Sequence, residues 1–499
     1  MTKDLYGTHL QGEKQAKWIQ VSATAGFASS YCKTTPSISS IMGVHSQSDS
    51  LQLPLEWSLM LTSFKHRTHQ ASVLAICLIV GLATPSLAEN WPQWRGPTGL
   101  SLSSETNLPI EWSESNHITA KIPLPISGSS TPAVWNDSIF VTVEDEGILQ
   151  LIKIDRATND IAWSLKVGEG TANRKQEGGS SRSPKYHNLH NMASPSPITD
   201  GEIVVVHFGN GDLAAYDFEG EQLWKLNLPE DYGNYSIWWG HANSPILYED
   251  LVISVCIQDS LADIQDEPVE SYIVAHDRLT GKEVWYTPRM TEANAEECDA
   301  YTTPIIRSTP SGDQLVVMGG NQLDAYDPHT GEQKWKLPGL VGGRTITGPT
   351  LADGLVYATV GMRGEIKAVR PEKLDEGIDA AVVWSYRNNT PDTCCPVVID
   401  KLLFMVSDNG IASCLNSQTG ELHWRERLGG DFKASPVYAD GHIYFLNKAG
   451  ECTVVDAAAE FRKISVNQLD DEFIASPAIS DGQILVRGKQ ALYVIESKP

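Results

Sequence analysis

The chain has 499 residues, with 38 Lys and Arg against 62 Asp and Glu, and a formal net charge of −24 at pH 7. A negative charge of this size excludes a protein whose main task is to bind nucleic acid or an anionic membrane surface. The eight cysteines show neither the spacing of a metal finger nor a C-x-x-C-H haem attachment site.

The first 88 residues differ from the rest of the chain. Residues 1–59 show no repeat and no sustained periodicity, and we expect them to be a spurious or disordered extension. From Met60 a basic stretch precedes an apolar run over 71–83 and a small-x-small end at Ala88. This order is typical of a secretory signal peptide, so 60–88 is predicted to direct the chain to the periplasm or the exterior. The apolar run is short for a membrane span.

Two segments, 275–285 and 325–335, both fit the pattern A-x-D-x-x-T-G-x-x-x-W. The alternation of apolar residues predicts a strand. The Asp is expected to accept hydrogen bonds from the backbone of the following turn, and the Gly to adopt φ > 0 in that turn. The chain then returns as an antiparallel strand that carries the Trp. One hairpin cannot bury an indole, so each copy needs a neighbouring copy. The key positions are Ala275, Asp277, Gly281, Trp285, Ala325, Asp327, Gly331 and Trp335.

Five weaker copies bring the total to seven. One has Asn159 in the Gly place, another contains a long insertion over 368–384, and in the last, 454–461, Phe461 replaces the Trp. The weaker copies keep the Trp or the Gly of the repeat at Trp163, Trp224, Trp384, Gly420 and Trp424.

A second signal precedes each copy, namely a small or hydroxyl residue, a proline, and an apolar run broken by a turn. Intervals of 40 to 65 residues between these prolines suit units of four short strands, the size of a propeller blade. The eighth unit lacks an outer strand, which we expect 108–125 to supply, because proteins avoid open sheet edges. The prediction is all-β: one domain over 89–499, an eight-bladed β-propeller of four-stranded antiparallel blades, closed by an N-terminal strand. The prolines are Pro132, Pro197, Pro245, Pro304, Pro349, Pro396, Pro436 and Pro477.

The repeat resembles the tryptophan-docking unit of eight-bladed quinoprotein propellers, over about 89–499. That family contains pyrroloquinoline-quinone (PQQ) dehydrogenases and the propeller lipoprotein of the outer-membrane-protein assembly machinery. The opening NWPQWRGP at 90–97 is similar to secreted bacterial PQQ-like repeat proteins. The resemblance implies that the segments ending in the eight prolines crowd one face around a central channel.

Three of these segments are long and unusual, and long loops on a rigid ring often carry binding sites. The loop 168–192 is basic, 231–243 is aromatic and 291–302 is acidic. We expect the binding face to be formed by Trp238, Trp239, His241, Tyr232, Tyr235, Arg174, Lys175 and Arg182. His187 and His190 form an H-x-x-H pair, but with no third ligand identifiable we expect no metal site.

The family resemblance also suggests candidates for a cofactor site. A vicinal disulfide stacks on the quinone in some PQQ dehydrogenases, and Cys394 and Cys395 are adjacent at a strand start. However, Cys395 occupies the slot that is Ser, Thr or Gly in most other units. The enzymes also need Ca²⁺ ligands, an Asp base and a cation. The candidates, which no spacing assembles into one site, are Asp299, Asp392, Asn243, Arg344 and Lys433.

We therefore expect a secreted, non-catalytic propeller that acts as a monomeric scaffold for a protein or glycan partner in the cell envelope. It would need no cofactor and would have no transmembrane span in the mature chain. The alternative is a PQQ- and Ca²⁺-dependent dehydrogenase of small alcohols or sugars, and a weaker one is carbohydrate binding through Trp238 and Trp239. Carboxylates and a cation converging at the channel mouth would favour the enzyme, whereas an apolar plug would favour the scaffold.

Overall fold

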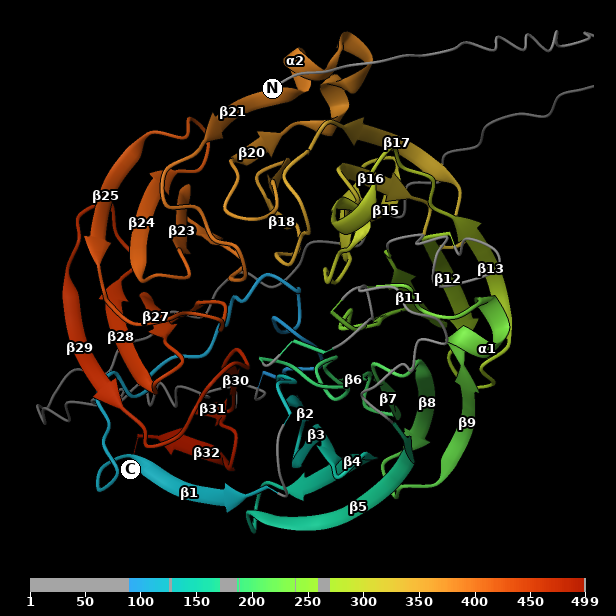
Figure 1. Cartoon of the computed structure of the whole chain (residues 1–499). Helices are drawn as coiled ribbons and strands as arrows, with labels where there is room; N and C mark the ends of the chain where they lie inside the picture. Colours follow the sequence, from blue (N-terminus) through green and yellow to red (C-terminus); the bar gives the residue numbers. More distant parts are fainter. Residues whose placement is uncertain are drawn as a thin grey trace, which may run out of the picture. The chain divides into compact units, whose positions relative to one another are not determined.

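The structure, a computed structural model, describes residues 89–124, 128–170, 186–187, 189–237, 239–258 and 270–497. In these ranges 32 strands form eight four-stranded antiparallel sheets. The sheets are set as blades around a central axis, as Figure 1 shows. The predicted eight-bladed β-propeller is therefore confirmed. The predicted extension 1–59 and signal peptide 60–88 lie outside the described residues.

Each inner strand begins directly after one of the eight prolines, so the proline marks where the chain enters a blade. The inner strands are β2 (Ala133–Trp135), β6 (Ile198–Thr199), β10 (Ile246–Tyr248), β14 (Ile305–Thr309), β18 (Thr350–Ala352), β22 (Val397–Ile399), β26 (Val437–Ala439) and β30 (Ala478–Ser480). The second strands are β3 (Ser138–Asp145), β7 (Ile203–His207), β11 (Leu251–Cys256), β15 (Gly312–Gly319), β19 (Leu355–Thr359), β23 (Leu402–Val406), β27 (His442–Leu446) and β31 (Gln483–Arg487).

The third strands are mostly buried. They are β4 (Ile148–Asp155), β8 (Asp212–Asp217), β12 (Tyr272–Asp277), β16 (Gln322–Tyr326), β20 (Ile366–Val369), β24 (Ile411–Asn416), β28 (Glu451–Asp456) and β32 (Ala491–Glu496). Of these, β8, β12, β16, β20 and β24 carry the Ala or Cys of the repeat. The outer strands are β5 (Asp160–Glu169), β9 (Gln222–Asn227), β13 (Glu283–Pro288), β17 (Gln333–Pro338), β21 (Val382–Tyr386), β25 (Leu422–Arg427), β29 (Lys463–Gln468) and β1 (Ile118–Pro123).

The short helices of the described residues lie in connections between strands. They are α1 (Leu228–Tyr232), α2 (Ile378–Ala381) and the 3-10 turns η1 (Ala295–Cys298) and η2 (Pro371–Glu376). Within the described ranges, no helix combines the length and the hydropathy that a membrane span requires.

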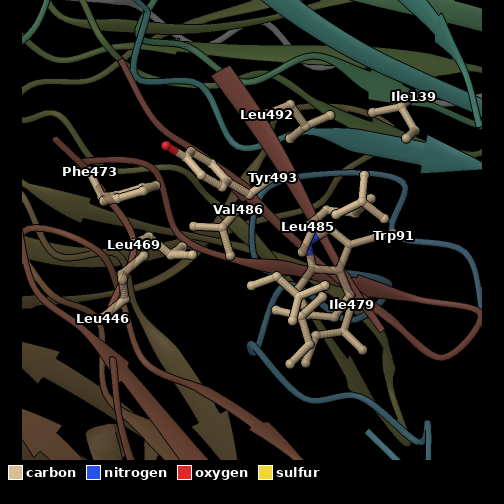
Figure 2. Close-up of a cluster of buried hydrophobic side chains, with 14 of the residues drawn as sticks. Trp91, Ile139, Leu446, Leu469, Phe473, Ile479, Leu485, Val486, Leu492 and Tyr493 are labelled. Atoms are coloured by element: carbon tan, nitrogen blue, oxygen red, sulfur yellow. The ribbon is translucent and has the colours of Figure 1, made fainter. Parts of the chain in front are cut away.

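The ring is closed by a sheet that combines strands from both ends of the propeller. β1 pairs antiparallel with β32, and its Ile122 lies opposite Leu492. Blade 8 thereby gains the outer strand that the C-terminal segment lacks, as the sequence predicted. Trp91, which is fully buried, packs with Ile479 and Leu485 of the same blade (Figure 2). Burial of this cluster stabilises the closure because it removes apolar surface of both ends from water.

The tryptophans join consecutive blades. Trp285 Nε1 donates to the carbonyl of Pro328 in the next blade at 3.1 Å. A Cβ on Gly331 of that same turn would lie 2.5 Å from the Trp285 ring, so this glycine is required by contact as well as by its φ of 71°. Equivalent bonds run from Trp163 to Phe218 O, Trp224 to Arg278 O, Trp384 to Ser417 O and Trp424 to Ala458 O.

The turn before each Trp also forms as the sequence predicts. Asp277 Oδ1 accepts from the Thr280 backbone N–H at 2.8 Å and from the Thr280 hydroxyl at 2.7 Å. These hydrogen bonds, the hydroxyl first, lower the pKa of Asp277. Asn159, in the Gly place of the first copy, has a φ of 59°, as expected for a residue that tolerates the left-handed region.

Two copies depart from the prediction. Trp335 Nε1 donates to Gln314 Oε1 of its own blade, because the insertion with η2 and α2 lies between the hairpin strands of the next blade. The assignment of Phe461 to a Trp position is wrong, because Ser465 is paired with Val454 there. Phe461 instead packs edge-on against Trp424 of the preceding blade.

An N-terminal strap, residues 90–103, contacts the inner strands of several blades. It forms bridges between Trp91 and Val134 and between Leu102 and Tyr438, in blades 1 and 7. Between them the buried Arg95 donates to Pro349 O at 3.0 Å and to Pro396 O at 3.1 Å. One segment thus ties blades that are far apart in sequence.

Candidate functional site: a cavity at the mouth of the channel

A cavity of about 430 Å³ lies where the segments that end in the eight prolines meet. All eight blades contribute to its wall, which confirms that these segments crowd one face around the channel. The contributing residues include Thr131, Ser196, Ser244, Thr303, Ile346, Thr393, Ser435 and Ser476.

A belt of hydrogen bonds holds this wall together. At six of the eight junctions, the residue before the proline donates its backbone N–H to the side chain of its counterpart in the next blade. The bonds run from Thr131 to Ser196, Ser196 to Ser244, Ser244 to Thr303, Gly348 to Cys395, Cys395 to Ser435 and Ser435 to Ser476, at 2.9 to 3.3 Å. Thr131 Oγ1 closes the belt by donating to Ser476 O at 3.3 Å. The small or hydroxyl residue before each proline therefore joins neighbouring blades.

The belt has one position without a side chain, Gly348. A Cβ there would lie 3.4 Å from the ring of Trp94, which reaches this place from the N-terminal strap. Trp94 lines the cavity and also a second one, of about 360 Å³, formed with the strap. The Trp94 ring therefore stands between the two cavities.

Charged side chains occupy one arc of the wall, and Arg344 and Lys433 form ion pairs with carboxylates of this arc. Arg344 lies 3.3 Å from Asp392 Oδ2 and 3.5 Å from Glu296 Oε1, so it bridges two carboxylates from different loops. Lys433 Nζ lies 2.8 Å from Asp408 Oδ2 and 3.1 Å from Asp431 Oδ1.

Burial affects these groups differently. Burial raises the pKa of Asp392 above its ordinary value, and the nearby charge of Arg344 only partly offsets that rise. Burial opposes the charge on Lys433, but the bonds to Asp408 and Asp431 outweigh it and raise the pKa of Lys433. Asp408 also accepts the backbone N–H groups of Asp392 and Thr393, which fixes the loop that carries Asp392.

The structure brings only some of the candidate residues to the cavity. Arg344, Asp392, Lys433 and Trp239 line it. Cys394 and Cys395 are buried free thiols outside its lining, and Cys395 is a member of the belt. Burial raises the pKa of the Cys394 thiol well above its ordinary value.

Asp299 and Asn243 are buried in the ring wall. Asn243 Nδ2 donates to Thr302 O at 2.8 Å, which joins blades 3 and 4.

The aromatic residues expected to form one binding face lie in three places. Tyr232 stacks on Tyr286 with 5.2 Å between ring centroids, beside the outer strand of blade 3. Tyr235 and His241 stack on each other inside the wall, at 4.8 Å. Trp239 is left at the cavity, where its Nε1 lies 3.5 Å from Glu296 Oε1. Trp238, Arg174, Lys175 and Arg182 lie outside the described residues.

The two histidines of the H-x-x-H pair both line the cavity but make separate contacts. The His187 ring meets Trp239 edge-on at 5.2 Å, whereas His190 Nε2 bonds the Trp239 carbonyl at 2.5 Å. Burial lowers the pKa of His190 to about 4, so its imidazole is neutral at pH 7. Among the described residues, no three His, Cys, Asp or Glu side chains are grouped so as to hold a metal ion.

Sequence reasoning missed Asp408, Arg363 and Trp94. Asp408 and Arg363 lie in turns between the second and third strands of blades 6 and 5, not in the segments before the prolines. Trp94 lies in the motif NWPQWRGP, which was recognised in the sequence. The motif did not indicate where the strap lies in the fold.

The residues at the mouth do not fit PQQ with Ca²⁺. Carboxylates and cations converge there, as the enzyme would require, but Asp392 and Asp408 are committed to Arg344 and Lys433. The adjacent cysteines, which would stack on a quinone, lie outside the lining. We therefore derive no step through a quinone.

The fold and the channel-mouth cavity define an eight-bladed propeller of the PQQ-repeat class. The chain belongs to the family described as outer membrane protein assembly factor BamB, whose model matches residues 102–260, 269–394 and 363–463. Outer membrane protein assembly factor BamB of Moranella endobia (strain PCIT) is 27% identical over 210 residues, which are 37% of this chain and 50% of that protein. The chain thus spans about half the length of the curated relatives it matches.

Two solved structures show the same fold. BamB from Moraxella catarrhalis has a TM-score of 0.51 at 14% identity, covering 76% of this chain and 99% of its own. Quinohemoprotein alcohol dehydrogenase from Comamonas testosteroni has a TM-score of 0.57 at 12% identity, covering 82% and 81%. At these identities the likeness extends to the fold alone.

Proposed function

We propose that this protein is an exported propeller that binds a protein partner in the cell envelope through the channel-mouth face and acts there as an assembly scaffold. The observation that carries the proposal is the match to the BamB family over most of the propeller. In this proposal 60–88 is the export signal and 89–499 the functional unit, working as a monomer without a cofactor.

The charged arc supports binding more than catalysis. Arg344, Asp392, Lys433 and Asp408 hold one another across three blades, so they stiffen the rim on which a partner would rest. Loops on a rigid ring offer such a surface without rearrangement of the blades.

The proposal can be tested by photo-crosslinking in the native cell envelope. A photoreactive phenylalanine replaces the exposed Arg363 at the cavity lip, and a control replaces Gly354 in the β18–β19 turn at the far end of that blade's inner strand. We expect a discrete cross-linked envelope protein from position 363 and none from position 354.

In a second experiment, the purified full chain is titrated with PQQ in the presence of Ca²⁺. Saturable PQQ binding together with no cross-link from position 363 would reject the scaffold and restore the dehydrogenase.

A further inference from the structure

The outer strand of every blade leaves one edge of its sheet without a partner strand. Proteins commonly protect such an edge with Lys or Arg, because a charged side chain opposes pairing with another chain. The outer strands of six blades follow this rule, whereas those of blades 3 and 5, β13 and β21, contain neither Lys nor Arg. The protecting residues are Lys121, Lys166, Lys225, Lys334, Lys336, Arg425, Arg427 and Lys463.

The strand β21 is protected by its neighbours. The segment with η2 and α2 directly precedes it. Arg425 of the next blade lies over the ring of Tyr386, 5.9 Å from its centroid, and donates to its hydroxyl. A cation therefore stands beside the last residue of β21, although the strand itself supplies none.

The edge of β13 is apolar instead. Four of the thirteen exposed large hydrophobic side chains in the described residues lie within 279–290. Val284 and Tyr286 stand on the strand itself, with Leu279 before it and Met290 after it. Exposed apolar side chains that gather along an open strand edge favour pairing with another chain.

Tyr286 distinguishes β13 from its counterparts. The residue after the Trp of the repeat is Lys225 in β9, Lys336 in β17 and Arg425 in β25, but Tyr286 in β13. Tyr286 keeps 37% of its surface exposed, although it stacks on Tyr232 of α1. A partly covered aromatic ring beside an open edge is suited to contact with another protein.

The surroundings of β13 are acidic, which determines the kind of partner. Glu283 begins the strand, and the exposed Asp231 directly precedes the tyrosine that stacks on Tyr286. Burial, followed by the nearby charges of Glu270 and Glu283, raises the pKa of Tyr286. Within 279–290 the exposed cation is Lys282, so these carboxylates outnumber it. A basic segment complements this edge, whereas a second copy of the chain would bring like charges together.

We propose that the free edge of β13 binds an extended, basic segment of a partner protein, which adds a fifth strand to blade 3. Backbone hydrogen bonds along 283–287 hold the segment, and Pro288, which has no N–H, ends the pairing. Alternate side chains of the segment pack on Val284 and Tyr286.

This surface is separate from the proposed protein-binding face. β13 lies on the outer rim of the ring (Figure 1), and none of its residues lines the channel-mouth cavity. Either assignment can fail while the other holds.

The test is a fluorescence-anisotropy titration of the purified full chain against a labelled peptide in which lysine and valine alternate. We expect saturable binding that weakens as salt is added. The same peptide N-methylated at every residue keeps its charge but has no backbone donors, so it should bind at least about tenfold more weakly. A peptide with glutamate in place of lysine should not bind.

Matched variants of the chain locate the site. Tyr286→Lys installs the kind of residue that β9 and β17 carry at this position, and it should weaken binding about tenfold. Val284→Lys should act similarly and leaves the stacked tyrosines in place. Ser385→Lys adds the same charge at the equivalent position of β21 and should leave binding unchanged.

Amide hydrogen exchange provides a second readout. Exchange within 283–287 should slow when the peptide binds, because the open edge becomes hydrogen-bonded. Slower exchange in the loops of the channel mouth instead would place the peptide on the other face and overturn the proposal.

Four further results would also overturn it. The first is no saturable binding, and the second is binding that survives N-methylation. The third is equal weakening by Tyr286→Lys and Ser385→Lys, which would indicate attraction to the acidic surface in general. The fourth is a dimer of the free chain that Tyr286→Lys dissociates, which would assign the edge to a second copy.

Discussion

The backbone N–H of Gly348 donates to the sulfur of Cys395 at 3.1 Å, across the junction between blades 5 and 6. In five other junctions of the belt a serine or threonine oxygen accepts the equivalent bond. The thiol therefore replaces a hydroxyl in a structural bond between blades. The adjacent thiol, Cys394, packs in the apolar core of blade 6 with Val397 and Phe404.

Cys395→Ala should destabilise the propeller by about 1–3 kcal/mol, because it leaves the buried Gly348 N–H without an acceptor. Cys395→Ser keeps an acceptor of the kind found at the other junctions, so its cost should stay below about 1 kcal/mol. Urea unfolding of the two variants measures the difference. Equal unfolding midpoints for the Ala and Ser variants would show that the bond across the junction contributes nothing.

Gly331→Ala should cost more than Gly354→Ala, although both glycines have similar φ values, 71° and 77°. A left-handed φ costs a non-glycine residue about 1–2 kcal/mol, and both variants should show that loss. A Cβ at Gly331 would also lie 2.5 Å from the Trp285 ring, whereas nothing lies within 4 Å of one at Gly354. Overpacking should add about 1–3 kcal/mol at Gly331 alone.

Thermal unfolding of the two glycine variants provides the measurement. If both midpoints fall equally, the side chains around Gly331 accommodate the added methyl group without cost, and the close approach of the Trp285 ring does not require glycine.

Much of the fold could be predicted because a propeller repeats one unit. The prolines located every inner strand, and the missing outer strand of blade 8 predicted the closing strand, found as β1. The register of the β28–β29 hairpin was predicted wrongly, because residue spacing alone was used to set it. Phe461 was placed opposite Val454, whereas Ser465 lies there.

The site was less predictable. Its charged arc joins loops of different blades, as in the pair Arg344 and Asp392, and no local pattern records which loops face each other. Trp94 and Arg95 contact blades far along the chain, so their short motif could not show that Trp94 lines the cavity and that Arg95 joins two blades. The small or hydroxyl residue before each proline could be recognised in the sequence. That these residues bond to one another from blade to blade becomes evident only once the blades are arranged in a ring.

Arg95→Lys should destabilise the fold by about 2–4 kcal/mol, despite keeping the charge. The guanidinium donates to Ser101 Oγ, Pro349 O, Thr350 Oγ1 and Pro396 O, at 2.8 to 3.2 Å. An ammonium cannot reproduce this planar set of donors, so buried acceptors of two blades lose partners. Urea unfolding measures the loss.

Arg462→Lys is the control for that substitution, because Arg462 pairs with Asp456 on an exposed turn. It should leave the unfolding midpoint unchanged. An equal effect of the two substitutions would mean that the strap does not hold the blades together.

Stability should fall as the pH is lowered from about 6.5 towards 5, through buried histidines. Burial lowers the pKa of His207 to about 3 and that of His190 to about 4, whereas both return to about 6.5 in the unfolded chain. Between these values the unfolded state binds more protons than the folded state, so the free energy of unfolding rises with pH and is lost as pH falls. Each histidine contributes at most about 1.4 kcal/mol per pH unit. Urea unfolding at several pH values gives the slope, and His207→Gln, which cannot titrate, should reduce it. A slope that this variant leaves unchanged would assign the acid sensitivity to other groups.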